Sequence, residues 1–210
     1  MPPTPPLRSR PAVRSRGRRR DAGRCDVGQY GGRVSFEAAT GPTPHVTIRR
    51  AVPADAMAIR DLVQLYAENR ILLAKELVGY FEAIPEFLVA VDDTSGRVIG
   101  CGALHVMWSD LAEVRTLAVH PDLRRRGVGH LLLAALLERA REYGLRRVFC
   151  LTFEVDFFSR HGFEPIQGTP IDPEVFSELL RSHDDGVAEF LDLAHVKPNT
   201  LGNTRMLVTL

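Results

Sequence analysis

Residues 112–129 read AEVRTLAVHPDLRRRGVG, and the apolar run LLLAALL of residues 131–137 follows directly. Val114, Leu117 and Val119 supply β-favouring apolar content for a strand, which a Pro-Asp pair ends. Beyond the turn, apolar residues recur at helical spacing (Leu133, Leu136, Leu137 and Ala140), and Glu138, Arg139, Arg141 and Glu142 are expected on the opposite, solvated side. The stretch therefore predicts a strand, a short basic turn and an amphipathic helix.

The turn has the features of an anion site. Gly127 and Gly129 open the helix, whose first backbone N–H groups have no partners within the helix and whose dipole favours negative charge. Arg124, Arg125 and Arg126 add guanidinium donors that suit phosphate. We therefore expect a diphosphate here, with the rest of the ligand lying along the strand. The alternative is an ordinary strand-to-helix turn with a solvated arginine cluster.

The pattern Arg124-x-x-Gly127-x-Gly129 resembles the pyrophosphate loop of the GCN5-related N-acetyltransferases (GNAT), and it fits neither the dinucleotide-binding nor the Walker spacing. The resemblance implies acetyl-CoA as co-substrate. The cofactor contacts that it implies are Leu117, Ala118, Val119, Arg124, Arg125, Arg126, Gly127, Val128, Gly129 and His130. It also implies that the backbone of residues 117–119 pairs with the pantetheine arm as a substitute strand and supplies the oxyanion donor.

The composition of the 210 residues indicates one globular domain with a tail. Hydrophobic residues make up 45% and the net charge is +1, which gives no case for bulk nucleic-acid binding. The longest apolar run, residues 131–137, is far shorter than the ~20 residues of a membrane span. Cys25, Cys101 and Cys150 show no CxxC spacing and predict reduced thiols in a cytoplasmic protein, two of them in the core.

Residues 1–44 are rich in proline and arginine and poor in apolar residues, which predicts a disordered extension. A targeting peptide or a nucleic-acid-binding tail are the alternatives. The remaining residues, 45–210, are expected to form the acetyltransferase domain.

From residue 46 onward the pattern predicts an α/β (α+β) fold, with a mixed, mostly antiparallel sheet flanked by helices. The expected strands are 46–50, 86–91, 97–108, 112–119, 147–151 and 205–210, and the expected helices begin at Pro53, near Glu76, after Gly127, at Glu154 and at Pro173. Residues 184–202 show no assignable pattern. The order of elements is that of the GNAT fold, whose sheet splays at the acetyl-CoA site.

Further segments resemble the acetyltransferase domain of bacterial N-acetylglutamate synthases, in the short form that lacks an amino-acid-kinase domain. These segments are residues 71–75 (ILLAK), 100–105 (GCGALH), 113–119 (EVRTLAV) and 157–163 (FFSRHGF). The resemblance covers residues 46–210 and implies acetyl transfer to the α-amino group of L-glutamate, the first step of arginine biosynthesis. L-Glutamine as a second acceptor, and inhibition by arginine, are left open.

Glu113 is the candidate general base. The attacking amine must lose a proton, and a carboxylate in a partly dry site can accept it, which is typically worth ~10²–10⁴ in rate. Glu113 lies on the strand that leads to the phosphate loop and matches the base glutamate of the family. The alternative is a strand glutamate on a solvated face.

The general acid is unassigned. Many members of the family protonate the departing thiolate with a tyrosine, and Phe158 stands at the matching position. A thiol pKa near ~8.5 allows the thiolate to leave without a proton donor. Phe158 is expected to pack against the cofactor or, equally, in the core.

A dicarboxylate substrate requires cations or N–H donors. By resemblance, Leu73 and Lys75 line the substrate site, with Lys75 on a carboxylate, and Thr116 and Arg205 are further candidates. A surface lysine is the alternative for Lys75, and the register at Arg205 is open. No metal is expected, and a homodimer is left open.

Competing functions are acetyl transfer to another amino acid or to a protein N-terminus, a non-catalytic acetyl-CoA sensor, and a nucleic-acid-binding module that acts through the basic tail. The presence of Glu113 beside an intact phosphate loop argues against the sensor.

Overall fold

The computed structural model describes residues 45–67, 72, 75–193 and 202–210. Packing divides the chain into Met1–Arg33 and Val34–Leu210, and every described residue belongs to the second unit. The extension predicted for residues 1–44 lies outside the described residues, as do Cys25 and Leu73.

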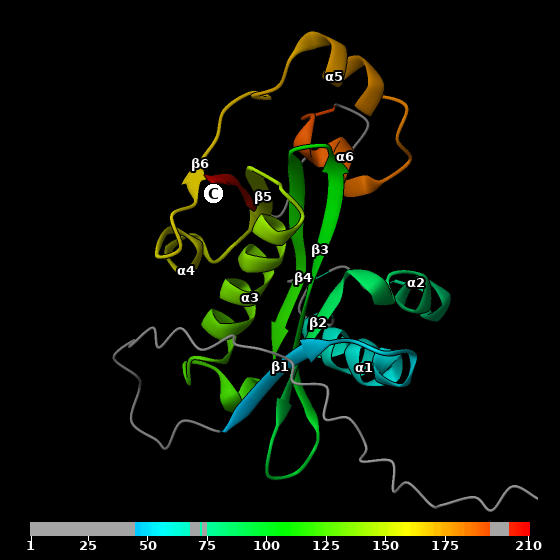
Figure 1. Cartoon of the computed structure of the whole chain (residues 1–210), viewed down its shortest axis with the longest axis vertical. Helices are drawn as coiled ribbons and strands as arrows, with labels where there is room; N and C mark the ends of the chain where they lie inside the picture. Colours follow the sequence, from blue (N-terminus) through cyan, green and yellow to red (C-terminus); the bar gives the residue numbers. More distant parts are fainter. Residues whose placement is uncertain (1–44, 68–71, 73–74, 194–201) are drawn as a thin grey trace, which may run out of the picture. The chain divides into compact units, whose positions relative to one another are not determined.

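Seven strands form one sheet in the order β1-β2-β3-β4-β5-β7-β6 (Figure 1). The strands are β1 (Val46–Arg50), β2 (Phe87–Asp92), β3 (Val98–Trp108), β4 (Leu111–Val119), β5 (Arg147–Thr152), β6 (Glu164–Pro165) and β7 (Thr204–Thr209). Neighbours pair antiparallel except β4 and β5, which are parallel. The predicted mixed, mostly antiparallel sheet is confirmed. The sequence does not predict β6, because two residues carry no alternation.

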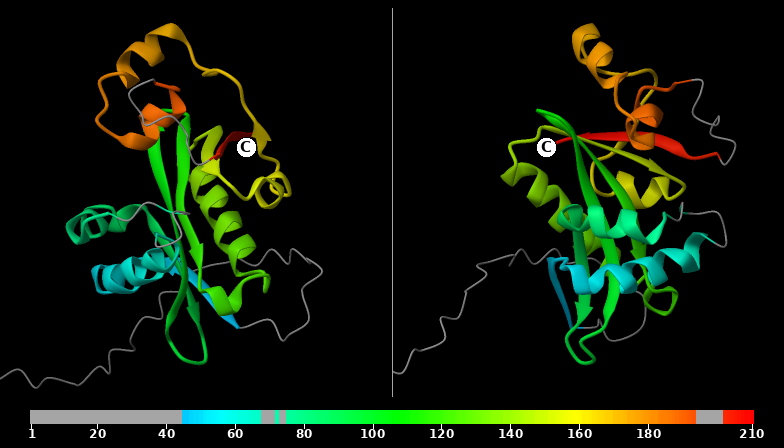
Figure 2. Two further views of the ribbon diagram at one scale, coloured as in Figure 1. Left: turned by 180° about the vertical axis from the view of Figure 1, so that it is seen from behind. Right: turned by 90° about the vertical axis from the view of Figure 1, so that its right-hand side faces the viewer.

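Helices cover both faces of this sheet. They are α1 (Ala56–Ala67), α2 (Leu77–Glu82), α3 (Val128–Glu142), α4 (Val155–Ser159), α5 (Pro173–Leu179) and α6 (Asp185–Phe190). Helix α3 lies on one face, and α1 with α2 lies on the other (Figures 1 and 2). Helix α6 falls within residues 184–202, for which the sequence shows no pattern, and packs with α5 in a separate apolar cluster.

Helix α3 is the central helix of the main core. Its inner face is fully buried at Leu132, Leu133 and Leu136. The expectation that Arg139 lies on the solvated side is wrong: the residue is 6% exposed, and its guanidinium donates to the backbone carbonyls of Pro85 and Glu86. The Glu86 carbonyl lies 3.1 Å from Arg139 Nη1 and 53 residues away in the chain, so the local helical pattern cannot reveal it.

Strand β4 contains a bulge at Thr116. Ala103 pairs with Arg115 and Cys101 with Ala118, so β4 has one residue more than β3 over this interval. Thr116 takes up this residue at φ +57°, in the left-handed region. The bulge reverses the side-chain alternation, because Ala112 and Val114 before it pack in the same cluster as Leu117 and Val119 after it.

Strands β4 and β5 separate after Glu113 and Phe149, ahead of the bulge. Their parallel ladder covers Leu111–Glu113 and Arg147–Phe149, whereas both strands continue in the described structure to Val119 and Thr152. One edge of the second half of β4 therefore faces the gap between the strands, with backbone groups available to a ligand.

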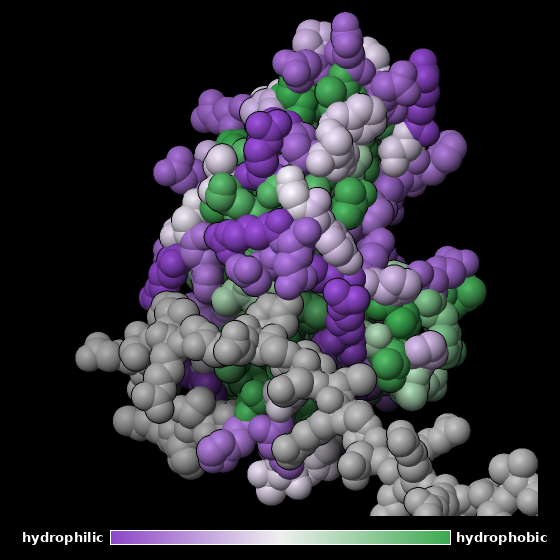
Figure 3. Space-filling view, in the orientation of Figure 1, coloured by the Kyte–Doolittle hydropathy of each residue, from purple (hydrophilic) through white to green (hydrophobic). Residues whose placement is uncertain are grey.

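The surface over α1 and α2 is partly apolar. Figure 3 shows this patch beside a face that is otherwise mostly polar. Its exposed apolar side chains are Met57, Leu65, Val78 and Phe81.

Cys101 and Cys150 are buried free thiols, which confirms the prediction that two of the cysteines lie in the core. Within the described ranges, no helix combines the length and the apolar character that crossing a bilayer requires.

Candidate active site

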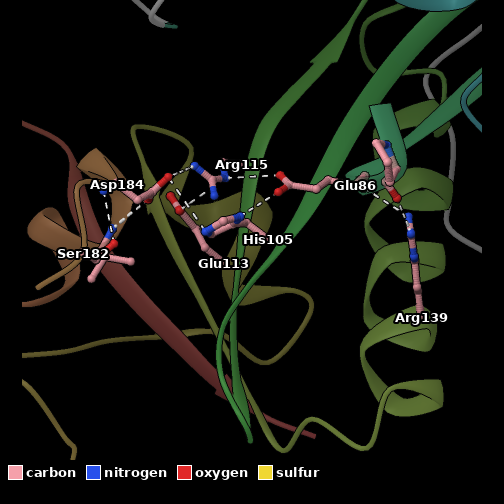
Figure 4. Close-up of polar contacts among 9 residues, drawn as sticks. Glu86, His105, Glu113, Arg115, Arg139, Ser182 and Asp184 are labelled. Atoms are coloured by element: carbon pink, nitrogen blue, oxygen red, sulfur yellow. Dashed lines mark hydrogen bonds and ion pairs between the residues drawn. The ribbon is translucent and has the colours of Figure 1, made fainter. Parts of the chain in front are cut away.

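A polar cluster lies where β3, β4 and α6 meet. Figure 4 shows its side chains: Glu86 from the 3-10 turn Ile84–Glu86, His105 on β3, Glu113 and Arg115 on β4, and Asp184, the N-cap residue of α6. His105 and Glu113 are direct partners in the β3–β4 register, so their side chains share one face of the sheet. Residues almost 100 positions apart in the chain thus converge on Glu113.

Glu113 is buried at 6% exposure, so the alternative of a glutamate on a solvated face is wrong. Its Oε2 atom has no hydrogen-bond partner among the described residues. Burial raises the pKa of Glu113 to about 8, the negative charge of Asp184 adds to the rise, and the positive charge of Lys75 opposes it. A carboxyl group of this pKa is suited to exchange a proton near neutral pH.

Arg115 forms an ion pair with Glu113, but it gives its hydrogen bond to Asp184. Its Nη1 donates to Asp184 Oδ2 at 2.9 Å, whereas its Nε lies 3.7 Å from Glu113 Oε2 and 3.9 Å from Glu86 Oε2. Figure 4 shows the guanidinium between the carboxylates of Asp184 and Glu86. Arg115 Nε, like Glu113 Oε2, is buried without a hydrogen-bond partner in the described structure.

Gly186 covers the Glu113 carboxylate. A Cβ built on Gly186 would lie 2.1 Å from Glu113 Oε2 and 2.9 Å from its Cδ, so a side chain here would force the Glu113 carboxylate to shift. Asp184 fixes the start of α6 by accepting from the backbone N–H of Val187 at 3.1 Å. The sequence reasoning did not find Asp184 or Gly186; the only local signal was an Asp before a short apolar group.

Glu86 and His105 form the far side of the cluster. His105 Nδ1 lies 2.7 Å from Glu86 Oε1, and His105 Nε2 lies 3.8 Å from Asp184 Oδ2. Burial raises the pKa of Glu86, and the charges of Arg115 and then Lys75 oppose that rise. Lys75 is exposed. Its positive charge lowers the pKa of both Glu86 and Glu113, which indicates that Lys75 lies near the cluster.

The predicted phosphate loop has the expected backbone. Gly127 is the N-cap of α3 at φ +83°, and Arg125 is also left-handed at φ +63°. Arg124 lies 3.3 Å from Glu154 and 6.0 Å from the Tyr66 ring centre. The Phe157 ring lies 3.4 Å from where a Cβ of Gly129 would stand, so this ring packs against the loop. The first turn of α3 therefore presents N–H groups beside three arginines.

The predicted cofactor residues outside the arginines and glycines of the loop lie in the core or on the second half of β4. Val128 is buried in the core, so only its backbone faces the loop. Leu117, Ala118 and Val119 lie on the half of β4 that has left β5, and the carbonyl of Val119 accepts from the Tyr66 hydroxyl. Thr116 occupies the bulge, and its carbonyl lies 3.6 Å from Cys101 Sγ.

Phe158 packs in the core. It is 6% exposed and makes edge contacts with Phe157 and Phe163, so of the two alternatives for this residue the structure favours core packing. The half-buried Phe157 is the ring that lies beside Gly129. His130 stacks on His161, with Nδ1 and Nε2 2.7 Å apart.

The predicted substrate residue Arg205 is not part of the cluster. Arg205 donates to the carbonyls of Gly168, at 3.0 Å, and Phe190, and it pairs with Asp192 at 3.4 Å, so its guanidinium holds the end of α6. Leu73 lies outside the described residues. In the described part of the chain, no group of three or more His, Cys, Asp or Glu residues could hold a metal ion.

The chain is similar in sequence to known proteins. Residues 58–163 match the family described as acetyltransferase (GNAT) family. An amino-acid acetyltransferase of Mycobacterium tuberculosis is 57% identical over 164 residues, which are 78% of this chain and 94% of that protein.

Two solved structures are similar. A Mycobacterium tuberculosis protein in complex with CoA and NLQ has 56% identity and a TM-score of 0.74, over 78% of this chain and 99% of that one. The N-acetylglutamate synthase of Neisseria gonorrhoeae, complexed with coenzyme A and N-acetyl-glutamate, has 25% identity and a TM-score of 0.62, over 79% of this chain and 35% of that one.

Proposed function

The chain belongs to the acetyltransferase (GNAT) family, and from this premise we propose that it transfers the acetyl group of acetyl-CoA to the α-amino group of L-glutamate. The observation that carries the proposal is Glu113, a buried carboxyl group with an unpartnered oxygen, on the strand that leads into the phosphate loop. Such transfer to L-glutamate is the first step of arginine biosynthesis, where we place the reaction.

The residues of this chain fit acetyl-CoA. The N–H groups at the start of α3 and the side chains of Arg124, Arg125 and Arg126 offer donors to a diphosphate. The edge of β4 that β5 leaves can pair with the amides of a pantetheine arm. When bound, acetyl-CoA supplies an acetyl group activated as a thioester.

In the proposed mechanism, Glu113 accepts the proton that the substrate ammonium must lose before its nitrogen can attack. Backbone N–H groups in residues 117–119 stabilise the negative charge that develops on the acetyl oxygen. The C–S bond breaks as the amide C–N bond forms, the nitrogen loses its second proton to water, and CoA leaves as a thiolate. Its pKa, near ~8.5 for a thiol, makes a dedicated proton donor unnecessary, in keeping with the core position of Phe158.

Glutamate is favoured as substrate by the cations of the site. Lys75 acts on the cluster from the solvent side, and Arg115 has a buried, unpartnered Nε within it. The Neisseria gonorrhoeae relative binds N-acetyl-glutamate, which would be the product here. We keep Lys75 as the proposed carboxylate contact and give Arg205 a structural role, because its guanidinium is bonded to protein groups.

Lys75→Met is expected to raise KM for glutamate by roughly 10- to 100-fold with little change in kcat. A charge-assisted contact contributes about 1.5–3 kcal/mol, and the carboxylate carries the same charge in the ground and transition states. Steady-state assays of thiol release, with glutamate and with glutamine, measure this. If Lys75 serves the side-chain carboxylate, KM for glutamine changes little; if it serves the α-carboxylate, both values rise.

Arg97→Met is the matched control, because Arg97 is an exposed cation in the turn between β2 and β3. It should leave both KM values unchanged. If KM for both amino acids in Lys75→Met stays within about twofold of the wild-type value, Lys75 is a surface residue. A thiol-release panel of the other amino acids and of peptide N-termini then tests the substrate: release with another amine and none with glutamate would overturn the proposed substrate.

A further inference from the structure

We propose that the start of α6 is a positioning element for the base: Gly186 covers the Glu113 carboxylate, and Asp184 holds the Arg115 guanidinium away from it. This inference rests on the proposed role of Glu113. Neither Asp184 nor Gly186 is proposed to touch the substrate, so both are positioning residues.

The first observation is the contact between Gly186 and Glu113. The backbone of Gly186 lies against the carboxylate so closely that a Cβ would overlap Oε2 at 2.1 Å. Helix α6 is anchored beyond this contact, because Val187 and Phe190 are buried and Arg205 binds the carbonyl of Phe190. The cover over Glu113 is therefore held by the apolar cluster that α5 and α6 share.

The second observation is the competition for Arg115. Its Nη1 is 2.9 Å from Asp184 Oδ2, within hydrogen-bond range, whereas its Nε is 3.7 Å from Glu113 Oε2, outside that range. A guanidinium bonded directly to Glu113 would stabilise the carboxylate and make it a weaker base, by about 1–3 pKa units. Asp184 engages the same guanidinium and leaves Glu113 with an unpartnered oxygen.

The charged and titratable groups that act on Glu113 come from every side. They are Lys75 ahead of α2, Glu86 in the 3-10 turn, His105 on β3, Arg115 on β4, the Cys150 thiol on β5, and Asp184 and Glu189 at α6. Of these, Asp184 has the largest negative-charge effect on Glu113, and it is the carboxylate that accepts the hydrogen bond of Arg115. Burial and Asp184 raise the pKa of Glu113, so loss of either should lower it.

Asp184→Asn tests the second observation without removing the helix cap, since asparagine is as good an N-cap residue as aspartate. Wild-type Glu113 should titrate near pH 8, followed by ¹³C NMR of its carboxyl carbon and assigned by the loss of that signal in Glu113→Gln. In Asp184→Asn the titration should move down by about 1–3 pH units, because Arg115 is free to bond to Glu113. The acid limb of kcat/KM should move in the same direction.

Gly186→Ala tests the first observation. Alanine is the better helix former, so any effect reflects the contact with Glu113 rather than helix propensity. The added methyl group should displace the Glu113 carboxylate from its covered position, expose it to water and also lower its titration point. Asp185→Asn is the matched control, because Asp185 is exposed and adjacent, and it should leave the titration of Glu113 unchanged.

The two proposals fail in distinguishable ways. If the wild-type protein does not acetylate glutamate, the proposed function fails, while the NMR titration still measures what Asp184 and Gly186 do to Glu113. If Glu113 titrates at the same pH in Asp184→Asn as in the wild-type protein, or if Asp185→Asn shifts it equally, the positioning role of Asp184 is overturned.

Discussion

Glu113→Gln should lower kcat for acetyl transfer by roughly 10²–10⁴ and leave the affinity for acetyl-CoA nearly unchanged. The amide has the shape of the carboxyl group but cannot accept the proton of the substrate ammonium. Glu113 lies on β4 ahead of the phosphate loop, so its substitution does not alter the predicted diphosphate site. Thiol-release kinetics and calorimetric titration with acetyl-CoA measure the two quantities separately.

If Glu113 is the base, the rate of acetyl transfer should rise with pH as this carboxyl group ionises. The pKa of Glu113 is raised to about 8, so the group is mostly protonated below that pH and cannot act as a base. At pH 7 about one tenth of it is ionised, so the wild-type rate should rise about tenfold per pH unit below pH 7, about fivefold from pH 7 to pH 8, and level off above that. Glu113→Gln should lack this part of the profile.

Glu138→Gln, on the exposed side of α3, is the control and should change neither the rate nor its pH dependence. Near-native turnover of Glu113→Gln at neutral pH would mean that another group, or water itself, takes the proton.

Gly127→Glu should abolish measurable binding of acetyl-CoA. Gly127 caps α3 at φ +83°, a conformation that side chains rarely adopt, and a carboxylate there would stand among the N–H groups and arginines predicted to hold the diphosphate. No atom lies within 4 Å of a Cβ at this position, so the expected effect is one of charge and backbone rather than of packing. Calorimetric titration measures it.

Two controls separate charge from backbone strain. Gly127→Ala introduces the strain without the charge and should retain more affinity than Gly127→Glu. Gly96→Glu introduces both at another left-handed glycine, φ +68° in the turn between β2 and β3, and should bind normally. Unchanged affinity in Gly127→Glu would remove the phosphate loop from the proposed cofactor site.

The sequence predicts the features that local chemistry determines. The basic turn, its two glycines and the helix after it lie within 20 consecutive residues, so their roles can be reasoned from capping and periodicity alone. The same holds for the strand that carries Glu113, whose position ahead of the turn follows from chain direction. The sheet order and the flanking helices follow from the resemblance together with this pattern.

The remainder of the site depends on tertiary contacts. Asp184 and Gly186 reach Glu113 from about 70 residues away, through a helix of six residues that has no periodic pattern to recognise. Arg139 is buried because it donates to backbone carbonyls that are distant in the chain, and the periodicity of its own helix carries no information about them. The choice between Phe157 and Phe158 as the ring beside the loop depends on the rotation of a five-residue helix, which two adjacent aromatic residues leave undetermined.

The separation of β4 from β5 has a consequence for folding. The two parts of the sheet, β1 to β4 and β5 with β7 and β6, are joined in the ladder by three residue pairs, Leu111–Glu113 with Arg147–Phe149. In the proposed binding mode the acetyl donor bridges the strands beyond these pairs, and a ligand that binds only the folded state stabilises it by mass action. At a ligand concentration 100 times Kd this adds about 2.7 kcal/mol to the free energy of unfolding. In this binding mode the supply of acetyl-CoA changes the stability of the fold as well as the rate of the reaction.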